Sequence, residues 1–239
     1  MSKDLSVKKS FLDKIRSSKP AVKKDQAVSD EKLRRAAGRA KKDKRKLLFS
    51  LDATASRHGA WEASQKITHS MFDCIPGELS VALSYHGGSR LKEFTEFTQS
   101  FKKFQDRLSL IECEAGATKL NDILDNASRI EDIGAIVYIG DCYEESLSSG
   151  TEICKKLRIN GCKLFIFQDK TDGENVQATH AFGAMVDVCG GALLDFNQQA
   201  IKEAEQLLTA ITLYSAGGKK LLEEKKKLPG AKLLLEKMK

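Results

Sequence analysis

The sequence predicts an α/β fold: a doubly wound, mostly parallel sheet with helices on both faces and one antiparallel edge strand. Short apolar runs alternate along the chain with longer segments whose apolar residues recur at helical spacing, as in strands joined by crossover helices. The apolar runs are also continuous, which suits strands buried on both faces of a sheet. At 239 residues, of which 41% are hydrophobic, the chain is long enough for one such domain with extensions.

The first half of the pattern begins with a buried strand at residues 47–52, followed by a helix at 58–72 and a second strand at 79–85. Residues 90–104 allow two predictions. A strand can pair back along the sheet edge and lead into a short helix, or the whole segment can form one helix. The single helix rests on phenylalanines at helical spacing, namely Phe94, Phe97, Phe101 and Phe104.

The second half of the chain alternates more regularly. Strands are predicted at residues 135–139, 163–168 and 191–196. Helices are predicted at residues 118–130, 147–157, 178–185 and 200–211. Because a helix separates each of these strands from the next, we expect the strands to run parallel in one sheet.

Composition divides the chain into three parts. Residues 1–45 are rich in Lys, Ser, Asp and Ala, which predicts a basic extension that is largely disordered or partly helical. Residues 46–213 hold the strand and helix pattern and are predicted to form the folded domain. Residues 214–239 are predicted to be a basic tail rich in Leu and Lys, whose leucines dock either on the body or on another chain.

The net charge of +7 is unevenly distributed. Lys and Arg exceed Asp and Glu by 11 in residues 1–46 and by 5 in residues 217–239, whereas residues 47–216 carry a net charge of −9. An acidic body argues against a nucleic-acid-binding core and favours the binding of cations. The basic arm supports a separate hypothesis, a nucleic-acid-associated scaffold. Its candidate anion-binding residues are Lys41, Lys42, Lys44, Arg45 and Lys46.

The six cysteines bear on the compartment. They form no C-x-x-C pair and lie mostly in or beside apolar segments, which favours buried, reduced thiols over disulfides or a zinc site. The Lys-rich N-terminus lacks the apolar stretch of a secretory signal, and no apolar run is long enough to span a membrane. We therefore expect a cytoplasmic protein without a membrane span.

Oxygen-bearing side chains follow two of the predicted strands. Asp52, Thr54 and Ser56 alternate after the first strand, Asp141 follows a later strand, and Thr118 stands at the start of a helix. In such a sheet, ligands bind beyond the carboxyl ends of the strands where strand order reverses, so these side chains are expected to face one crevice. Hard oxygen donors favour Mg²⁺ or Mn²⁺ over Zn²⁺. Ser56, Thr118 and Asp141 each suit an ordinary helix cap as well, so it is the combination that predicts a site.

The arrangement resembles the metal-ion-dependent adhesion site of von Willebrand factor A (VWA) domains. The motif Asp52-x-Thr54-x-Ser56, then Thr118, then Asp141 carries the resemblance, which extends over most of the chain. The expected order of strands and helices, including the hairpin of the second and third strands, fits the family as well. The family more often has Ser where this chain has Thr54, but a threonine hydroxyl can also bind a metal.

The resemblance implies a mechanism for binding rather than catalysis. Ser56, Thr54 and Thr118 would coordinate the cation, which is Mg²⁺ or Mn²⁺, with Ca²⁺ as a further candidate. Asp52 and Asp141 would act mainly through water molecules. The remaining position would take an Asp or Glu from a partner protein.

The resemblance also suggests a subgroup and a role. Segments 213–220 and 233–235 look like those of bacterial, intracellular, stand-alone VWA proteins. The expected role is a cation-dependent protein-interaction module, such as an assembly or chaperone-linked factor, and not an enzyme. His58, Glu144 and Glu145 are candidates for the rim that contacts the partner, although the two glutamates are also expected to cap the helix that follows them.

An enzyme is the alternative. Haloacid-dehalogenase-like phosphatases also have an apolar strand that ends in Asp and a later Gly-Asp pair. On that pattern Asp52 would be the nucleophile, and Gly140-Asp141 with Glu144 or Glu145 would hold Mg²⁺. The residues that follow Asp52 depart from that family's usual pattern, so we prefer the adhesion-type site.

Overall fold

The computed structural model describes residues 46–54, 67–73, 79–196 and 201–238. All of them lie in one compact unit, residues 43–239. The unit contains a six-stranded sheet with the order β3-β2-β1-β4-β5-β6. Its strands are β1 (Lys46–Asp52), β2 (Ser80–Gly87), β3 (Arg90–Phe94), β4 (Ile133–Gly140), β5 (Lys163–Asp169) and β6 (Ala192–Phe196).

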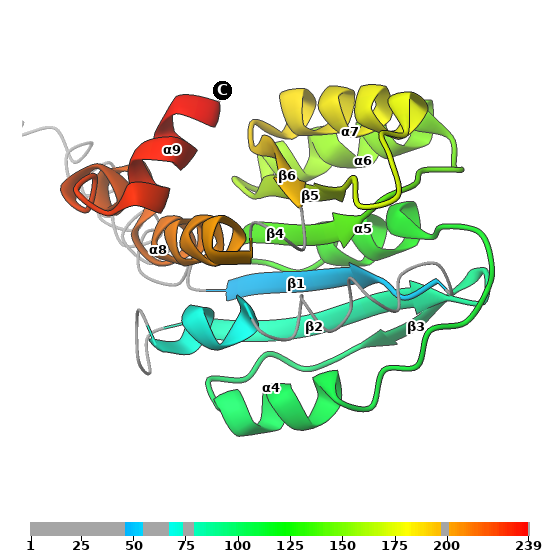
Figure 1. Cartoon of the computed structure of the whole chain (residues 1–239), viewed down its shortest axis with the longest axis horizontal. Coiled ribbons are helices and arrows are strands. Elements are labelled where there is room, and N and C mark those ends of the chain that lie inside the picture. The colour runs from blue at the N-terminus through cyan, green and yellow to red at the C-terminus, as the bar shows by residue number, and fades with distance from the viewer. Residues whose placement is uncertain (1–45, 55–66, 74–78, 197–200, 239) are drawn as a thin grey trace, which may run out of the picture. The chain divides into compact units, whose positions relative to one another are not determined.

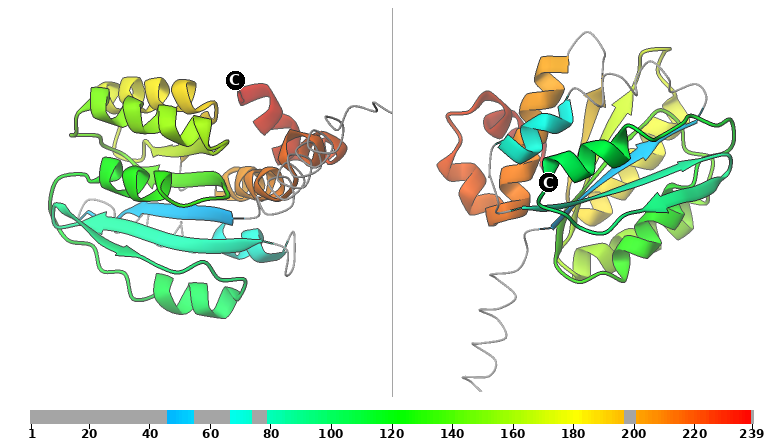
Figure 2. Two further views of the ribbon diagram at one scale, coloured as in Figure 1. Left: turned by 180° about the vertical axis from the view of Figure 1, so that it is seen from behind. Right: turned by 90° about the horizontal axis from the view of Figure 1, so that it is seen from below.

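Helices cover both faces of this sheet (Figures 1 and 2). They are α4 (Phe101–Leu108), α5 (Leu120–Ser128), α6 (Leu147–Ile159), α7 (Val176–Cys189), α8 (Ile201–Glu224) and α9 (Pro229–Lys237). The side chains of α5, α6 and α7 form one apolar cluster with the sheet, and those of α4, α8 and α9 form another on the opposite face. Of the helix predicted at 58–72, the described part, residues 67–73, is helical and joins the second cluster.

The predicted fold class is confirmed. All neighbouring strands run parallel except β3, which pairs antiparallel with β2 at the edge of the sheet. The strands coincide with the continuous apolar runs; β4, for example, is buried along its whole length. Burial on both faces explains why these strands show no alternation of apolar and polar residues.

The structure decides between the two predictions for residues 90–104. A strand followed by a helix is confirmed, and the single helix is wrong. The chain beyond β3 stays extended, with Thr98 bridging to Val81, until the Ser100 side chain caps α4 by accepting a hydrogen bond from the Lys103 N–H. The phenylalanines therefore divide between two cores: Phe97 packs toward the α5–α7 face and Phe104 toward the opposite face.

The strand order reverses between β1 and β4. From β1 the chain moves to β2 and β3 on one side and then returns to β4 on the other side of β1. Such a switch point leaves a crevice at the carboxyl ends of the two diverging strands. In Figure 1 these ends of β1 and β4 point to the right, away from α8 and α9.

The C-terminal region is helical and joins the core. Helix α8 continues past residue 213, where the sequence suggests a boundary, and breaks its helical geometry only at Gly218 (φ 66°, ψ −166°). Leu222 and Leu234 are fully buried in the apolar cluster that includes α8. The Ser215 hydroxyl donates to the Lys46 carbonyl, 2.9 Å away, at the start of β1. The division into residues 1–45, 46–213 and 214–239 stays a prediction.

Two further features concern the cysteines and the character of the helices. Five cysteines lie within the described residues as reduced thiols, and Cys154, Cys162 and Cys189 among them are buried. Among the helices that the structure describes, none combines the length and apolar character needed to cross a membrane.

Candidate metal centre at the switch point

Asp52 and Thr54 stand where β1 leaves the sheet. The two residues are only 5% and 8% exposed. The Thr54 N–H donates to Asp52 Oδ1 over 2.9 Å, and the Ala53 N–H donates to the His86 carbonyl over 2.8 Å. These bonds hold the first residues after β1 against the end of β2, so Asp52 and Thr54 remain at the sheet edge. Ser56 lies outside the described residues.

Thr118 lies in the loop before α5 and is 2% exposed. Its Oγ1 accepts a hydrogen bond from the Glu144 N–H (3.0 Å), and its own N–H donates to Glu144 Oε2 (3.2 Å). The cap position of α5 belongs to Lys119, whose side chain makes no capping bond. Thr118 therefore ties its loop to the loop after β4 instead of capping its own helix.

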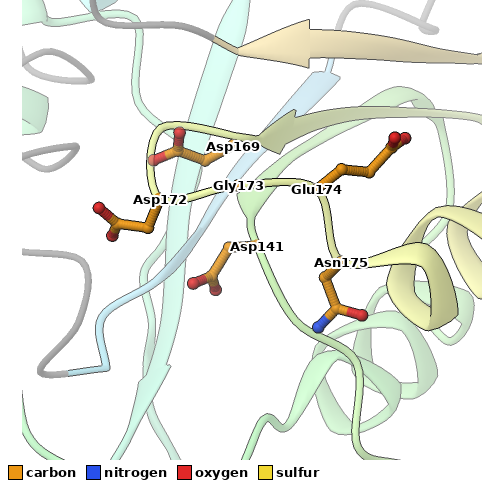
Figure 3. A pocket seen from close by; sticks show the side chains of 6 residues that line it. All are labelled: Asp141, Asp169, Asp172, Gly173, Glu174 and Asn175. Carbon is orange, nitrogen blue, oxygen red and sulfur yellow. The ribbon is translucent and has the colours of Figure 1, made fainter.

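Asp141 directly follows β4 and lines a pocket of about 270 Å³. The other residues of the pocket come from the end of β5 and the loop that leads to α7: Asp169, Asp172, Gly173, Glu174 and Asn175. Figure 3 shows Asp141 on the side of the pocket opposite Asp169, while the Glu174 side chain points away from Asp141. The Glu174 carboxylate pairs with Lys170 (3.2 Å). Three aspartates thus give this side of the crevice a negative potential that favours a cation.

The register of the strands places these segments at one level of the sheet. Leu51 pairs with Ile139, so Asp52, the last residue of β1, and Asp141, which follows β4, lie at the same end of neighbouring parallel strands. The two hydrogen bonds between Thr118 and Glu144 bring the third segment to the same edge. Asp52, Thr54, Thr118 and Asp141 therefore lie around the switch point, at the carboxyl ends of β1 and β4.

Glu145 caps a helix, but not the one expected from the sequence. Its carboxylate accepts hydrogen bonds from the Leu120 N–H (2.6 Å) and the Asn121 N–H (3.0 Å) at the start of α5. Helix α6, which follows Glu145, is capped by the Ser146 side chain. Burial raises the pKa of Glu145 to about 7, although both backbone hydrogen bonds act to lower it. The expectation that Glu145 caps the helix after it, α6, is therefore wrong, because Glu145 caps the helix before it, α5.

His86 is a buried polar residue of this region that the sequence does not single out. It pairs with Asp52 in the parallel ladder, and its Nδ1 lies 3.8 Å from Asp52 Oδ1. Its Nε2 lies 2.9 Å from the Tyr138 hydroxyl oxygen. Burial lowers the pKa of His86 to about 4, so the imidazole is neutral at pH 7. The predicted second strand ends at residue 85, two residues before the end of β2; extending it would have shown that His86 reaches the carboxyl edge.

The donor set fits a hard divalent cation. The two carboxylates and two hydroxyls are oxygen donors, the ligand type that Mg²⁺ and Mn²⁺ prefer. Within the described ranges, no three His, Cys, Asp or Glu side chains gather closely enough to hold a metal by themselves. A cation at this place would therefore also need the hydroxyl oxygens of Thr54 and Thr118, which are buried beside the carboxylates.

The other predicted residues lie elsewhere or outside the described ranges. His58 and four residues of the basic arm, Lys41, Lys42, Lys44 and Arg45, are not among the described residues. Lys46 is engaged within the fold: its Nζ donates to the Glu131 carbonyl (3.2 Å) and lies 5.5 Å from the centre of the Phe97 ring.

Comparison with known proteins gives matches at the level of structure. No protein-family model and no curated protein matches the sequence. The VWA domain protein of Catenulispora acidiphila is 13% identical, with a TM-score of 0.58, and the match covers 72% of this chain and 42% of that one. The conserved hypothetical protein BatB from Bacteroides thetaiotaomicron is 14% identical, with a TM-score of 0.54, covering 70% of this chain and 98% of that one.

A third structure carries a metal. Proximal thread matrix protein 1 of the mussel byssus, with zinc in its metal-ion-dependent adhesion motif, is 12% identical, with a TM-score of 0.56, covering 71% of this chain and 45% of that one. This chain thus spans less than half of the Catenulispora and mussel structures. At such identities the likeness concerns the fold. The chain has the fold of VWA domains, as the sequence motif predicts.

Proposed function

We propose that this protein is a divalent-cation-dependent protein-interaction module that binds an Asp or Glu of its partner through a metal. The observation that carries the proposal is the placement of Asp52, Thr54, Thr118 and Asp141 around one switch point. Ser56 completes the proposed ligand set. The VWA fold supports this function, because the mussel protein of the same fold has a metal in its adhesion motif.

The chemistry of the ligands explains why an outside carboxylate would bind. Hydroxyl oxygens coordinate a cation without neutralising it, and two carboxylates acting through water neutralise it only partly. The cation therefore retains positive charge toward solvent, and a partner's Asp or Glu supplies the missing anionic ligand. Mg²⁺ and Mn²⁺ suit the oxygen donors best, with Ca²⁺ as a further candidate.

The proposal extends to the setting of the protein. The reduced cysteines are consistent with a reducing compartment, which supports a cytoplasmic location. We propose an assembly or chaperone-linked role of the bacterial stand-alone type, with Glu144 and His58 at the partner-binding rim. No observation on the described residues favours the phosphatase alternative or the nucleic-acid scaffold.

A metal titration of thermal stability tests the site. A ligand that binds only the folded state stabilises it by RT ln(1 + [L]/Kd), about 2.7 kcal/mol at a hundred times Kd. We expect Mg²⁺ or Mn²⁺ to raise the melting temperature of the wild type and of Asp106→Asn. Asp106 is an exposed carboxylate on α4, which makes its variant a matched control. Asp52→Asn should lose most of the response, and an equal response in all three proteins would contradict the proposal.

A capture experiment tests the role in binding. Proteins retained by the wild type in Mg²⁺ are compared with those retained in EDTA, and with those retained by Asp52→Asn. We expect the specific partner to be lost in both comparisons. If the partner is still retained in EDTA and by Asp52→Asn, the contact is not bridged by a metal. In a separate assay, phosphate release from a phosphomonoester by the Mg²⁺-loaded wild type would favour the phosphatase instead.

A further inference from the structure

A row of polar side chains lies beneath the candidate metal centre, on an otherwise apolar face of the sheet. Asp52 on β1 pairs in the ladder with His86 on β2, and Tyr138 on β4 pairs with Ser50, two residues before Asp52. His86 and Tyr138 are fully buried. A buried polar group costs free energy unless it is hydrogen-bonded, so the arrangement of this row requires an explanation.

The backbone at the end of β4 leaves room for this row. A Cβ placed on Gly140 would lie 2.7 Å from the Tyr138 hydroxyl oxygen, so the tyrosine ring occupies the space that a side chain at position 140 would fill. From there the Tyr138 hydroxyl reaches across β1 to His86 Nε2 (2.9 Å). The two rings are close to parallel, at 24°, with centroids 5.9 Å apart.

The direction of the hydrogen bonds follows from the surroundings of the fully buried imidazole: Nε2 faces the Tyr138 hydroxyl and Nδ1 faces the Asp52 carboxylate. An uncharged imidazole ring carries one N–H and one acceptor nitrogen. If Nε2 carried the proton, the lone pair of Nδ1 would face Asp52 Oδ1 at 3.8 Å, and two buried acceptors would oppose each other. If Tyr138 donates to Nε2, Nδ1 carries the proton and directs it toward the carboxylate. Within the described residues Nδ1 has no other hydrogen-bond partner. The second arrangement is therefore the more stable one.

We propose that Tyr138 and His86 form a positioning pair for Asp52: the Tyr138 hydroxyl donates to His86 Nε2, and the His86 Nδ1–H points at Asp52 Oδ1. The pair holds the carboxylate in one orientation and leaves its other oxygen to the cation. Partners of this kind typically change metal affinity by 10- to 100-fold. The orienting role rests on the proposed metal site, whereas the direction of the hydrogen bonds does not.

The first experiment determines the tautomer of His86 in the full chain without metal. Nitrogen chemical shifts and long-range ¹H–¹⁵N couplings of the labelled imidazole distinguish a proton on Nδ1 from a proton on Nε2. We expect the Nδ1–H form at pH 7 in the wild type and in Tyr138→Phe, because the Asp52 carboxylate still faces Nδ1 in the variant. The nitrogen resonance of Nε2 should shift in Tyr138→Phe, because Nε2 loses the hydroxyl that donates to it. An Nε2–H form in the wild type, or an Nε2 resonance that is the same in Tyr138→Phe, would overturn the proposal.

The second experiment separates the two ring nitrogens by substitution. In His86→Asn the amide nitrogen lies near the position of Nδ1 and can still donate to Asp52, whereas in His86→Gln it reaches the position of Nε2. Mn²⁺ titrations of thermal stability should give His86→Asn a Kd within a few-fold of the wild type, and His86→Gln a Kd at least 10-fold weaker. Equal loss in both variants, or the reverse order, would refute the orienting role.

The two experiments also distinguish a failure of the proposed metal site from a failure of the Tyr138–His86 pair. A wild type that does not respond to Mg²⁺ or Mn²⁺ would refute the metal site and with it the orienting role, while the tautomer still decides the direction of the hydrogen bonds. If the His86 variants fail to fold, Tyr138→Phe replaces them, with an expected loss of Mn²⁺ affinity; an unchanged affinity would contradict the pair's role.

Discussion

At the end of β4, an added Cβ on Gly140 would lie 2.7 Å from atoms of the Tyr138 side chain, which is far below an ordinary contact. Tyr138 is fully buried and its hydroxyl is bound to His86, so it has little room to withdraw. The residue directly before Asp141 is therefore fixed by packing. A change there would displace the polar row beneath the candidate metal centre rather than the metal ligands themselves.

We expect Gly140→Ala to reduce the free energy of unfolding by about 1–3 kcal/mol, because overpacking a close-packed core forces side chains out of their preferred rotamers. Gly183→Ala is the matched control, since a Cβ there meets nothing within 4 Å and the residue lies inside α7. Alanine should stabilise that helix by up to about 1 kcal/mol. Urea denaturation of both variants checks the prediction, which is wrong if Gly140→Ala is neutral.

At the scale of single elements, α5 depends on a residue that is distant in sequence. Its N-terminal N–H groups are satisfied by Glu145 from the loop after β4, and its own cap residue Lys119 contributes no side-chain bond. The same loop binds Thr118 through Glu144. Helix α5 and the β4–α6 loop are therefore stabilised together, and both border the switch point.

Glu145 predicts a pH dependence of stability. Its pKa is raised by burial to about 7 in the folded protein, above the ordinary value of 4.5. Between these two values the folded state thus binds more protons than the unfolded state. The contribution of Glu145 to the free energy of unfolding is therefore fully present below pH 4.5 and is lost as the pH rises to 7. We expect Glu145→Gln to remove this fall in unfolding free energy. Urea denaturation between pH 4.5 and 7.5 measures it, and a contribution of opposite sign would mean that the backbone hydrogen bonds outweigh burial.

At the scale of the whole molecule, the two ends of the sheet differ. The carboxyl ends of β1 and β4 carry the candidate metal centre and a pocket lined by Asp141, Asp169 and Asp172. At the opposite end, α8 packs near the start of β1 and α9 packs against α8 (Figure 1). The Ser215 hydroxyl of α8 donates to the Lys46 carbonyl. The C-terminal helices therefore lie away from the proposed partner-binding site and contribute to the core.

A pair of leucine variants tests the contribution of α9. Leu234 is fully buried, whereas Leu228 is 44% exposed at the start of the same helix. We expect Leu234→Ala to lower the free energy of unfolding by about 2–5 kcal/mol, because it leaves a cavity in the core. Leu228→Ala should change it by no more than about 0.5 kcal/mol. Equal, small effects of both variants would indicate a tail that does not belong to the folded domain.

Outside residues 90–104 and the C-terminal region, the sequence alone determined the strand and helix order, because continuous apolar runs and helical periodicity are local consequences of burial. It also placed Asp52 and Asp141 correctly at the carboxyl ends of strands, since each directly follows its apolar run. The ambiguity at residues 90–104 arose because phenylalanines at helical spacing also fit a strand followed by a helix. Only the pairing of β3 with β2 decided between the two.

The tertiary structure decided what depends on contacts between distant segments. Parallel register set His86 beside Asp52, a loop 25 residues away supplied the cap of α5, and packing against the sheet buried Leu234. No local pattern encodes these contacts, because parallel strands and their crossovers join residues that are far apart in the chain. The sequence therefore determined which side chains could form a site, and the order of the strands decided which of them lie next to one another.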